Sequence, residues 1–352
     1  MPAVLHRDPV MAPNCSNVSS PPVPSLVFAS LYSLVFVAGL LLNSMAAWVF
    51  FQICSKRRTF VLYLRNMVAA DLLMTLTLPV TILSEAGVGP WWLPVLSCRY
   101  TAVLFYCCMY TNVLFLGLVA LDRYLKIVRP FGGRCGDCLY SYSFTLAMAA
   151  MVWLAMLTLS LPNTILTNKV ATVETAHSCK CLKGDLGIRW HGAVVYINIG
   201  IFFTVLIILV TCYMSIFRHI RRSSAQFVKG GPGGQRDAKS GHNILVLLVV
   251  FFVCFVPYHL WRIPFTRSQT QSSFSPEVES ILLNGKKATL FLSSCNVCLD
   301  PIIYFLMCKS FRGKLAKTLG LKSLIQKSIY SPMSERKQIV LRFKENSSSS
   351  SS

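Results

Sequence analysis

The sequence predicts an all-helical membrane protein with seven transmembrane helices. Of its 352 residues, 54% are hydrophobic and only 13% are charged, which is about half the charged fraction of an ordinary soluble domain. The apolar residues are gathered into seven runs, each near the roughly 20 residues that a helix needs to cross a bilayer. Such runs adopt helices because lipid offers no hydrogen-bond partners to an open backbone. The predicted spans are residues 25–52, 60–84, 97–128, 142–166, 192–220, 241–266 and 281–307.

The distribution of polar residues divides the chain into four predicted segments. Residues 25–307 form the seven-transmembrane domain, and residues 1–24 precede it as a glycosylated extracellular segment. In residues 308–324 basic and apolar side chains alternate, which predicts an amphipathic helix attracted to the anionic lipid of the inner leaflet. Residues 325–352 end in a run of serines, which predicts a disordered cytoplasmic tail.

The positive charges indicate how the helices are oriented. The chain carries 34 Lys and Arg against 13 Asp and Glu, a net charge of +21. Basic residues gather after the first, third, fifth and seventh spans, and the positive-inside rule makes that side the cytoplasm. The N-terminus is then extracellular, where Asn14 and Asn17 begin two glycosylation sequons. This placement favours a multi-pass protein of the plasma membrane and explains the charge without a nucleic-acid partner.

Two carboxylates lie inside predicted spans, where a charge costs about 2.5–3.5 kcal/mol on insertion scales. They are Asp71 in the second span and Asp300 in the seventh. Two carboxylates in one bundle repel unless they are protonated or bridged by a cation. The side chains of Asn43, Asn112 and Asn296 are further oxygen ligands within reach of such a site. The pattern favours an interior sodium or proton site, with a hydrogen-bonded polar cluster lacking an ion as the alternative, and it indicates no other metal or cofactor.

The third span ends in a charged triplet, Asp122-Arg123-Tyr124. We expect the arginine to pair with its neighbouring aspartate at rest and to contact a cytoplasmic partner once released. The alternative is a helix-end charge pair that reaches toward the membrane surface. Pro257, with Phe255, and Pro301 are the predicted hinges, because proline kinks a helix; the alternative is that the kinks only shape a static pocket. The predicted inner switch consists of Asp122, Arg123, Tyr124, Tyr213 and Tyr304.

Basic residues also gather at the predicted outer ends of the fifth, sixth and seventh spans. They are Lys180, Lys183 and Arg189 before the fifth span, Arg262 and Arg267 at the end of the sixth, and Lys286 and Lys287 at the start of the seventh. Low-dielectric walls around such a cluster focus its field on an anion. Arginine grips phosphate through two hydrogen bonds, and a buried arginine without a partner is costly. The alternative is a set of solvated loop charges. Aromatic residues that would stack on a base or line an acyl channel are Tyr106, Tyr110, Tyr258 and Phe265.

Seven motifs, each in its proper span, together resemble the rhodopsin-like G-protein-coupled receptors. They are Asn43, Ala70-Asp71, Cys98, Asp122-Arg123-Tyr124, Trp153, Pro257 and Asp300-Pro301 with Tyr304. Finer strings at 74–79, 255–259 and 262–266 resemble the purinoceptor cluster of the ADP and UDP-glucose receptors. The stretch 98–132 is most similar to the orphan branch near the UDP-glucose receptor.

The resemblance implies a ligand site. Its members at matching positions are Tyr106, Asn163, Lys183, His191, Arg262 and Lys286. Three positions depart from the pattern. Lys287 stands where the nucleotide receptors have glutamate, Phe265 where several have tyrosine, and Val195 where some have asparagine. We therefore expect a more basic site, which leaves room for an anionic lysophospholipid beside nucleotides and nucleotide sugars.

The resemblance also implies partners and cross-links. The receptor is expected to couple to heterotrimeric G proteins of the inhibitory type, and to an arrestin-like protein through phosphorylated tail serines. A disulfide is expected between Cys98 and Cys179, which leaves Cys15 and Cys181 as a candidate second pair.

Other functions remain as alternatives to a receptor. An anion transporter would show inverted repeats or a continuous polar pore, and the sequence shows neither. A membrane enzyme would need a nucleophile and base, or a cluster of metal ligands, within the spans, and none is present. A non-signalling scavenger of the same fold stays open, because the sequence does not prove coupling.

Overall fold

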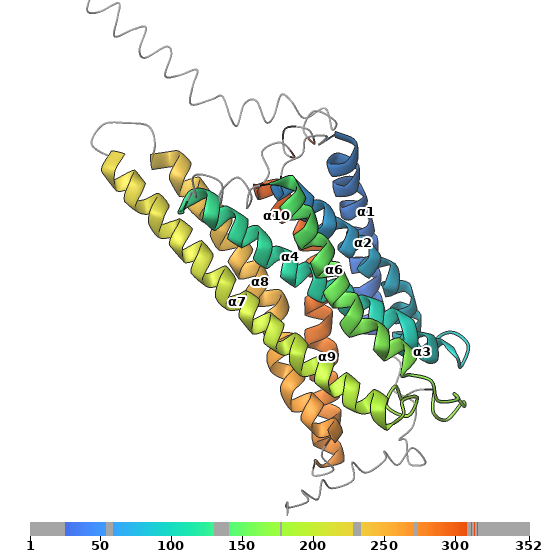
Figure 1. Ribbon diagram of the computed structural model, residues 1–352. Helices are drawn as coiled ribbons and strands as arrows, with labels where there is room; N and C mark the ends of the chain where they lie inside the picture. The colour runs from blue at the N-terminus through green and yellow to red at the C-terminus, as the bar shows by residue number, and fades with distance from the viewer. Residues whose placement is uncertain are drawn as a thin grey trace, which may run out of the picture.

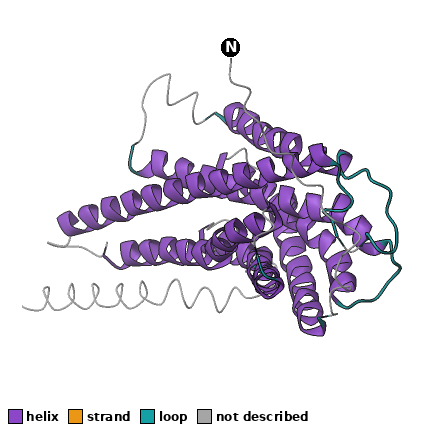
Figure 2. Ribbon diagram, turned by 90° about the horizontal axis from the view of Figure 1, so that it is seen from below, coloured by secondary structure: helices purple, strands orange, loops and turns teal. Residues whose placement is uncertain are grey.

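The computed structural model is a bundle of long helices packed side by side (Figure 1). It describes residues 25–53, 59–129, 141–176, 178–227, 234–270 and 274–307, with 311, 313 and 315. Within these ranges, seven helical stretches are long and apolar enough to cross a membrane, as the sequence predicts. Figure 2 shows helices and connecting loops, with no strand among the residues described. The seven are Leu26–Phe51, Thr59–Glu85, Leu93–Ile127, Tyr142–Ile165, Asp185–Arg222, Leu247–Gln269 and Pro276–Phe305.

Some spans are built from more than one helical element. The third joins the short helix α3 (Leu93–Leu96), a π-helical turn η3 (Ser97–Thr101) and α4 (Ala102–Ile127). The seventh joins α9 (Pro276–Ser294) and α10 (Asn296–Met307) across Cys295. The remaining helices are α1 (Leu26–Trp48) with the π-helical turn η2 (Val49–Ile53), α2 (Thr59–Glu85), α6 (Tyr142–Ile165), α7 (Asp185–Phe227) and α8 (Gly234–Thr270).

Helix α4 forms the centre of the bundle and packs against α2, α6 and α7. Its buried side chains, such as Val113 and Phe115, belong to the main hydrophobic core. Polar bonds add to this packing, since the indole nitrogen of Trp153 in α6 donates to Asn66 Oδ1 in α2 at 3.0 Å. The central helix therefore carries residues of both ends of the molecule on one rigid element.

Several expectations fall wholly or partly outside the described residues. Of the predicted amphipathic helix at 308–324, the structure describes Phe311, Gly313 and Leu315, which are helical. Phe311 is buried with its ring centroid 5.0 Å from that of Phe50. The N-terminal segment with Asn14 and Asn17, and the tail from residue 325, lie outside the described residues.

Candidate functional site

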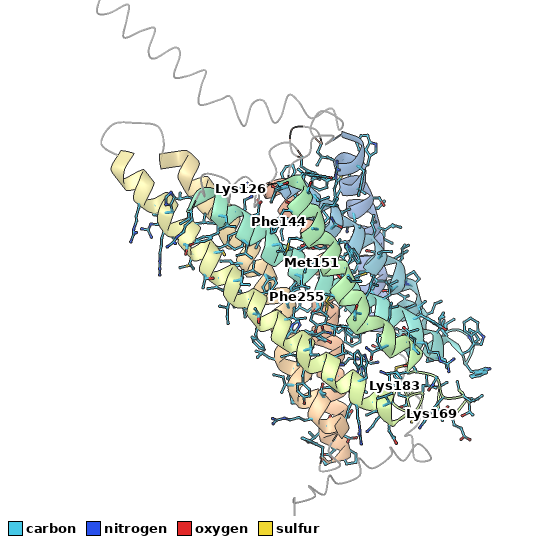
Figure 3. All side chains as sticks on the ribbon, in the orientation of Figure 1. Lys126, Phe144, Met151, Lys169, Lys183 and Phe255 are labelled. Carbon is cyan, nitrogen blue, oxygen red and sulfur yellow. A yellow bond between two sulfur atoms is a disulfide. The ribbon has the colours of Figure 1, made fainter. Side chains whose placement is uncertain are left out.

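Polar side chains gather at three levels along the bundle. Lys183 lies at one end and Lys126 at the opposite end (Figure 3). We name the Lys183 end the outer end and the Lys126 end the inner end, after the sides expected from the loop charges. A third group surrounds Asp71, which is fully buried within α2.

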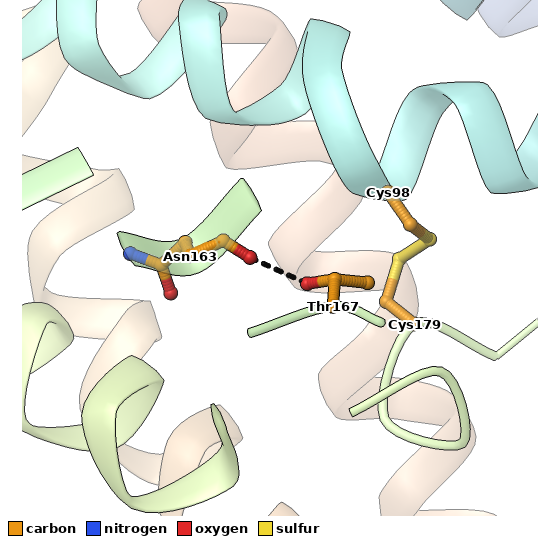
Figure 4. Close-up of a disulfide and its surroundings, with 4 residues drawn as sticks. All are labelled: Cys98, Asn163, Thr167 and Cys179. Carbon is orange, nitrogen blue, oxygen red and sulfur yellow. Dashed lines mark hydrogen bonds between the residues drawn. A yellow bond between two sulfur atoms is a disulfide. The ribbon is translucent and has the colours of Figure 1, made fainter. Parts of the chain in front are cut away.

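The loop between α6 and α7 is fixed to the outer end by covalent and hydrogen bonds. Cys98 and Cys179 form a disulfide with their Cα atoms 5.4 Å apart, which confirms the expected bridge. Close to this bridge, Thr167 Oγ1 donates to the backbone oxygen of Asn163 at 2.6 Å (Figure 4). Cys181 is also disulfide-bonded, and its expected partner Cys15 lies outside the described residues. The disulfide therefore fixes the loop that contains Lys183 to the outer end of the bundle.

Arg262 is the centre of the outer group. It lies in α8, is only 6% exposed, and directs its guanidinium toward α7 and α4. One of its nitrogens lies 3.5 Å from His191 Nε2, and His191 Nδ1 lies 3.3 Å from Asn163 Oδ1. A neutral imidazole with its proton on Nδ1 satisfies both contacts. The guanidinium carbon also lies 5.9 Å from the centre of the Tyr106 ring.

Two lysines complete what we call the outer basic cluster, which consists of Lys183, Arg262 and Lys286. Lys286 Nζ lies 5.6 Å from the Phe265 ring centre, and the Arg262 guanidinium carbon lies 5.5 Å from the same ring. Lys183 is 7% exposed, and burial together with the charge of Arg262 lowers its pKa to about 8. In the described part of the chain, none of the three forms an ion pair. The cluster therefore holds positive charge that an anion would neutralise.

Lys287 does not add to this cluster, and the expectation that it makes the site more basic is wrong. Its Nζ bonds Glu85 Oε2 at 2.9 Å, which ties α9 to the outer end of α2. Glu85 was not among the predicted site residues, because it lies 202 positions from Lys287 in the sequence. Only the packing of two distant helices brings the pair together.

An aromatic layer lies beneath the cluster. The rings of Tyr106 and Tyr258 stack with centroids 6.3 Å apart, and His259 Nε2 lies 3.1 Å from the Tyr110 hydroxyl. Phe202 of α7 stacks on His259 with centroids 3.7 Å apart. The stack continues from Phe202 to Phe251, and Phe251 contacts Phe255. Continuous ring contacts thus lead from the cluster to the predicted hinge.

The predicted ion-site residues meet in the middle of the bundle. Asp71 accepts hydrogen bonds from Asn112 Nδ2 at 2.6 Å and from the Tyr304 hydroxyl at 3.1 Å. Asn296 Nδ2 donates to Asp300 Oδ2 at 2.7 Å, and Asp300 is buried like Asp71. The Oδ1 atoms of Asn112 and Asp300 are buried without a partner among the residues described. Oxygen donors of this kind fit a hard cation or a shared proton.

The inner end differs from the expectation for the charged triplet. Asp122 bonds Lys126 Nζ at 2.6 Å and Thr59 Oγ1 at 3.3 Å, and Lys126 also donates to Thr59. The Arg123 guanidinium carbon instead lies 3.7 Å over the Phe60 ring. The predicted pairing of Asp122 with Arg123 is therefore wrong for this structure. Adjacent residues on a helix point apart, whereas residues four apart face each other.

The three tyrosines of the predicted inner switch lie in different surroundings. Tyr213 is buried in α7, and its hydroxyl has no hydrogen-bond partner among the described residues. Tyr304 bonds Asp71, so it belongs to the middle group in this structure. Tyr124 is partly buried at the inner end of α4. Lys126 was not among the predicted residues of the inner switch. Its position four residues after Asp122 in a helix would have indicated the ion pair.

Comparison with known proteins agrees with this geometry. Residues 42–304 match the family described as 7 transmembrane receptor (rhodopsin family). The chain is 48% identical to G-protein coupled receptor 87 of Mus musculus over 299 residues, which covers 85% of this chain and 82% of that protein. It is 43% identical to P2Y purinoceptor 14 of Bos taurus, covering 89% of this chain and 91% of that protein. It is 40% identical to P2Y purinoceptor 13 of Homo sapiens, covering 86% of this chain and 83% of that protein.

These matches confirm the resemblance to the purinoceptor cluster and its orphan relatives. Proteins of this family are multi-pass signalling receptors of the plasma membrane rather than enzymes. The seven spans, the outer disulfide and a family match that covers most of the bundle agree with one another. The chain therefore belongs to the rhodopsin family of seven-transmembrane G-protein-coupled receptors.

Proposed function

We propose that this receptor is activated by an extracellular, phosphate-bearing nucleotide or nucleotide sugar and couples to inhibitory G proteins. The observation that carries the proposal is the outer basic cluster, where Lys183, Arg262 and Lys286 converge without an ion pair in the described structure. A phosphate beside them would relieve the cost of a buried guanidinium. It would also gain charge-assisted hydrogen bonds, each worth about 1.5–3 kcal/mol.

The aromatic side chains support an organic ligand rather than a simple ion. Tyr106 and Phe265 both lie within cation–π distance of Arg262, so the cluster presents flat apolar faces beside its charges. A base stacks on such faces. Two of the relatives are P2Y purinoceptors by name. An acyl chain would use the same faces, so a lysophospholipid is the alternative ligand.

The orientation and the inner partners complete the proposal. With the N-terminus outside, the outer basic cluster faces extracellular ligands and the inner end of α4 faces the G protein. Arg123 would contact that G protein once the inner end opens, and phosphorylated tail serines would recruit an arrestin-like protein. A sodium ion held by Asp71, Asn112, Asn296 and Asp300 would stabilise one of the two states.

The test is inhibition of cyclic AMP formation in cells that express the full chain. Wild type and Arg262→Gln are compared against ADP, UDP-glucose and lysophosphatidic acid. Arg267→Gln is the matched control, since Arg267 lies on the same helix and is exposed. At equal surface expression, we expect Arg262→Gln to raise the half-maximal concentration by about 10- to 100-fold, the value of one charge-assisted hydrogen bond.

Each outcome separates the candidates. A response to ADP or UDP-glucose that needs Arg262 supports the nucleotide proposal, and blockage by pertussis toxin supports inhibitory coupling. A response to lysophosphatidic acid alone favours the lipid alternative. A full response in Arg262→Gln would show that the cluster does not bind the ligand.

A further inference from the structure

Helices α8 and α9 make an unusually close contact next to the outer basic cluster. Trp261 of α8 donates its indole N–H to the backbone oxygen of Leu282 in α9 at 3.0 Å. The ring lies against Gly285, where a Cβ atom would overlap Cε2, Cζ2 and Nε1 of the indole. Only glycine leaves room for the tryptophan at this distance. We refer to the contact between Trp261 and Gly285 as the outer joint.

The outer joint lies directly beside two members of the cluster. Trp261 precedes Arg262 in α8, and Gly285 precedes Lys286 in α9. Leu282, whose carbonyl accepts the indole N–H, stands four residues before Lys286. In an α-helix that carbonyl is also the acceptor for the Lys286 backbone N–H. The indole therefore fixes the same turn of α9 from which Lys286 projects.

The positions of the two cations need such a constraint. The Arg262 guanidinium carbon and Lys286 Nζ lie 5.5 and 5.6 Å from one ring, that of Phe265. The like charges repel each other, and no carboxylate within the described ranges pairs with either. The Phe265 ring offers each of them a cation–π contact. That attraction alone does not set the distance between two separate helices.

We propose that Trp261 and Gly285 are positioning residues that hold Arg262 and Lys286 at the spacing of one phosphate-bearing ligand. The inference rests on the proposed function for the identity of the anion, but not for the position of the charges. Neither residue touches the ligand. The joint offsets the repulsion between the cations by packing and by one hydrogen bond. A receptor without the joint would carry the same charges at a wider and less uniform spacing.

The ligand test uses Gly285→Ala and Trp261→Phe in the full chain. Gly200→Ala is the matched control, because a Cβ there meets nothing within 4 Å. With UDP-glucose as the probe, we expect both joint variants to weaken binding by about tenfold at equal surface expression, the value of one misplaced charge-assisted contact. The loss should disappear when either variant is combined with Lys286→Gln. An equal loss of affinity when Lys286 is already replaced by Gln would overturn the proposal, because the joint would then affect binding without positioning Lys286.

A second measurement needs no ligand and separates this inference from the proposed function. In the purified ligand-free receptor, Lys286→Gln should raise the melting temperature by about 2 °C, because it relieves repulsion that the joint enforces. In the Trp261→Ala background, where the helices are free to separate, that gain should vanish. An equal gain in both backgrounds would overturn the inference. If UDP-glucose does not bind wild type but the rise in melting temperature still depends on Trp261, the nucleotide proposal is wrong and the positioning role of the outer joint is supported.

Discussion

The lowered pKa of Lys183 predicts that ligand affinity depends on pH. Burial and the neighbouring Arg262 lower this pKa to about 8 from the ordinary value of 10.5. About 90% of Lys183 is therefore charged at pH 7 and about 10% at pH 9, by the titration curve of one group. A phosphate ligand has its second pKa near 6, so its own charge is constant over this range. We expect its dissociation constant to rise by about tenfold between pH 7 and pH 9.

The matched variant for this prediction is Lys183→Arg. Arginine stays charged across the whole range, so its pH profile should be flat. Binding is measured on purified receptor with a phosphate-bearing ligand at constant ionic strength. A pH-independent affinity in wild type, or an unchanged slope in Lys183→Arg, would refute the assignment of Lys183 to the ligand site.

The stability of the ligand-free receptor should follow the opposite trend. Because the folded-state pKa of Lys183 is depressed, the unfolded chain binds more protons between about pH 8 and 10.5. Stability therefore rises with pH through that window. The difference between 10.5 and about 8 corresponds to about 3 kcal/mol, a cost that is fully present at neutral pH. Thermal unfolding at pH 7 and pH 9.5 should show this gain in wild type and lose it in Lys183→Met.

Three further predictions concern the middle group and the two ends. Replacing choline by sodium at constant ionic strength should raise the melting temperature of the ligand-free receptor, and Asp71→Asn should abolish the effect, because a cation that binds only the folded state stabilises it. Lys126→Met should raise basal inhibition of cyclic AMP, since it removes a tie from α4 to Thr59 in α2, while Lys126→Arg should keep the basal level. Glu85→Gln should lower stability by no more than about 1 kcal/mol but tighten phosphate binding, because it releases the charge of Lys287; Lys287→Gln should lower stability without that gain.

The sequence predicts the fold well because membrane spans leave a strong signal. Each apolar run appears as a helix, since lipid leaves the backbone no alternative. The helix ends are less well predicted, and α7 begins at Asp185 rather than near residue 192. Helical turns that leave the membrane become polar, so hydropathy no longer marks them. At α9 a usable signal exists, because Ser275 caps Val278 N and Pro276 follows as the first helical residue.

The sequence predicts where the charged residues of the site lie, but not which other residues they pair with. The sequence places Arg262 and Lys286 near the same end, and the structure brings both to Phe265. It does not reveal that Lys287 is neutralised by Glu85, since that pair depends on how two helices pack. The positions of basic residues can be taken from the sequence, whereas the acidic residues that neutralise them are known only once the packing of the helices is known.

Two contacts between α8 and α9 show how an outer ligand would act on the hinge. Ser293 Oγ of α9 donates to the backbone oxygen of Cys254 at 2.8 Å, less than one turn before Pro257. The indole of Trp261 makes the second contact one turn beyond Pro257. Helix α8 is therefore fixed to α9 on the inner side of Pro257 through Cys254 and on the outer side through Trp261. The proline between them leaves α8 without one helical backbone hydrogen bond. A ligand that pulls on Arg262 would thus move α8 and α9 together, and the bend would be taken up between the two contacts, at Phe255 and Pro257, where the Phe255 ring touches that of Phe251.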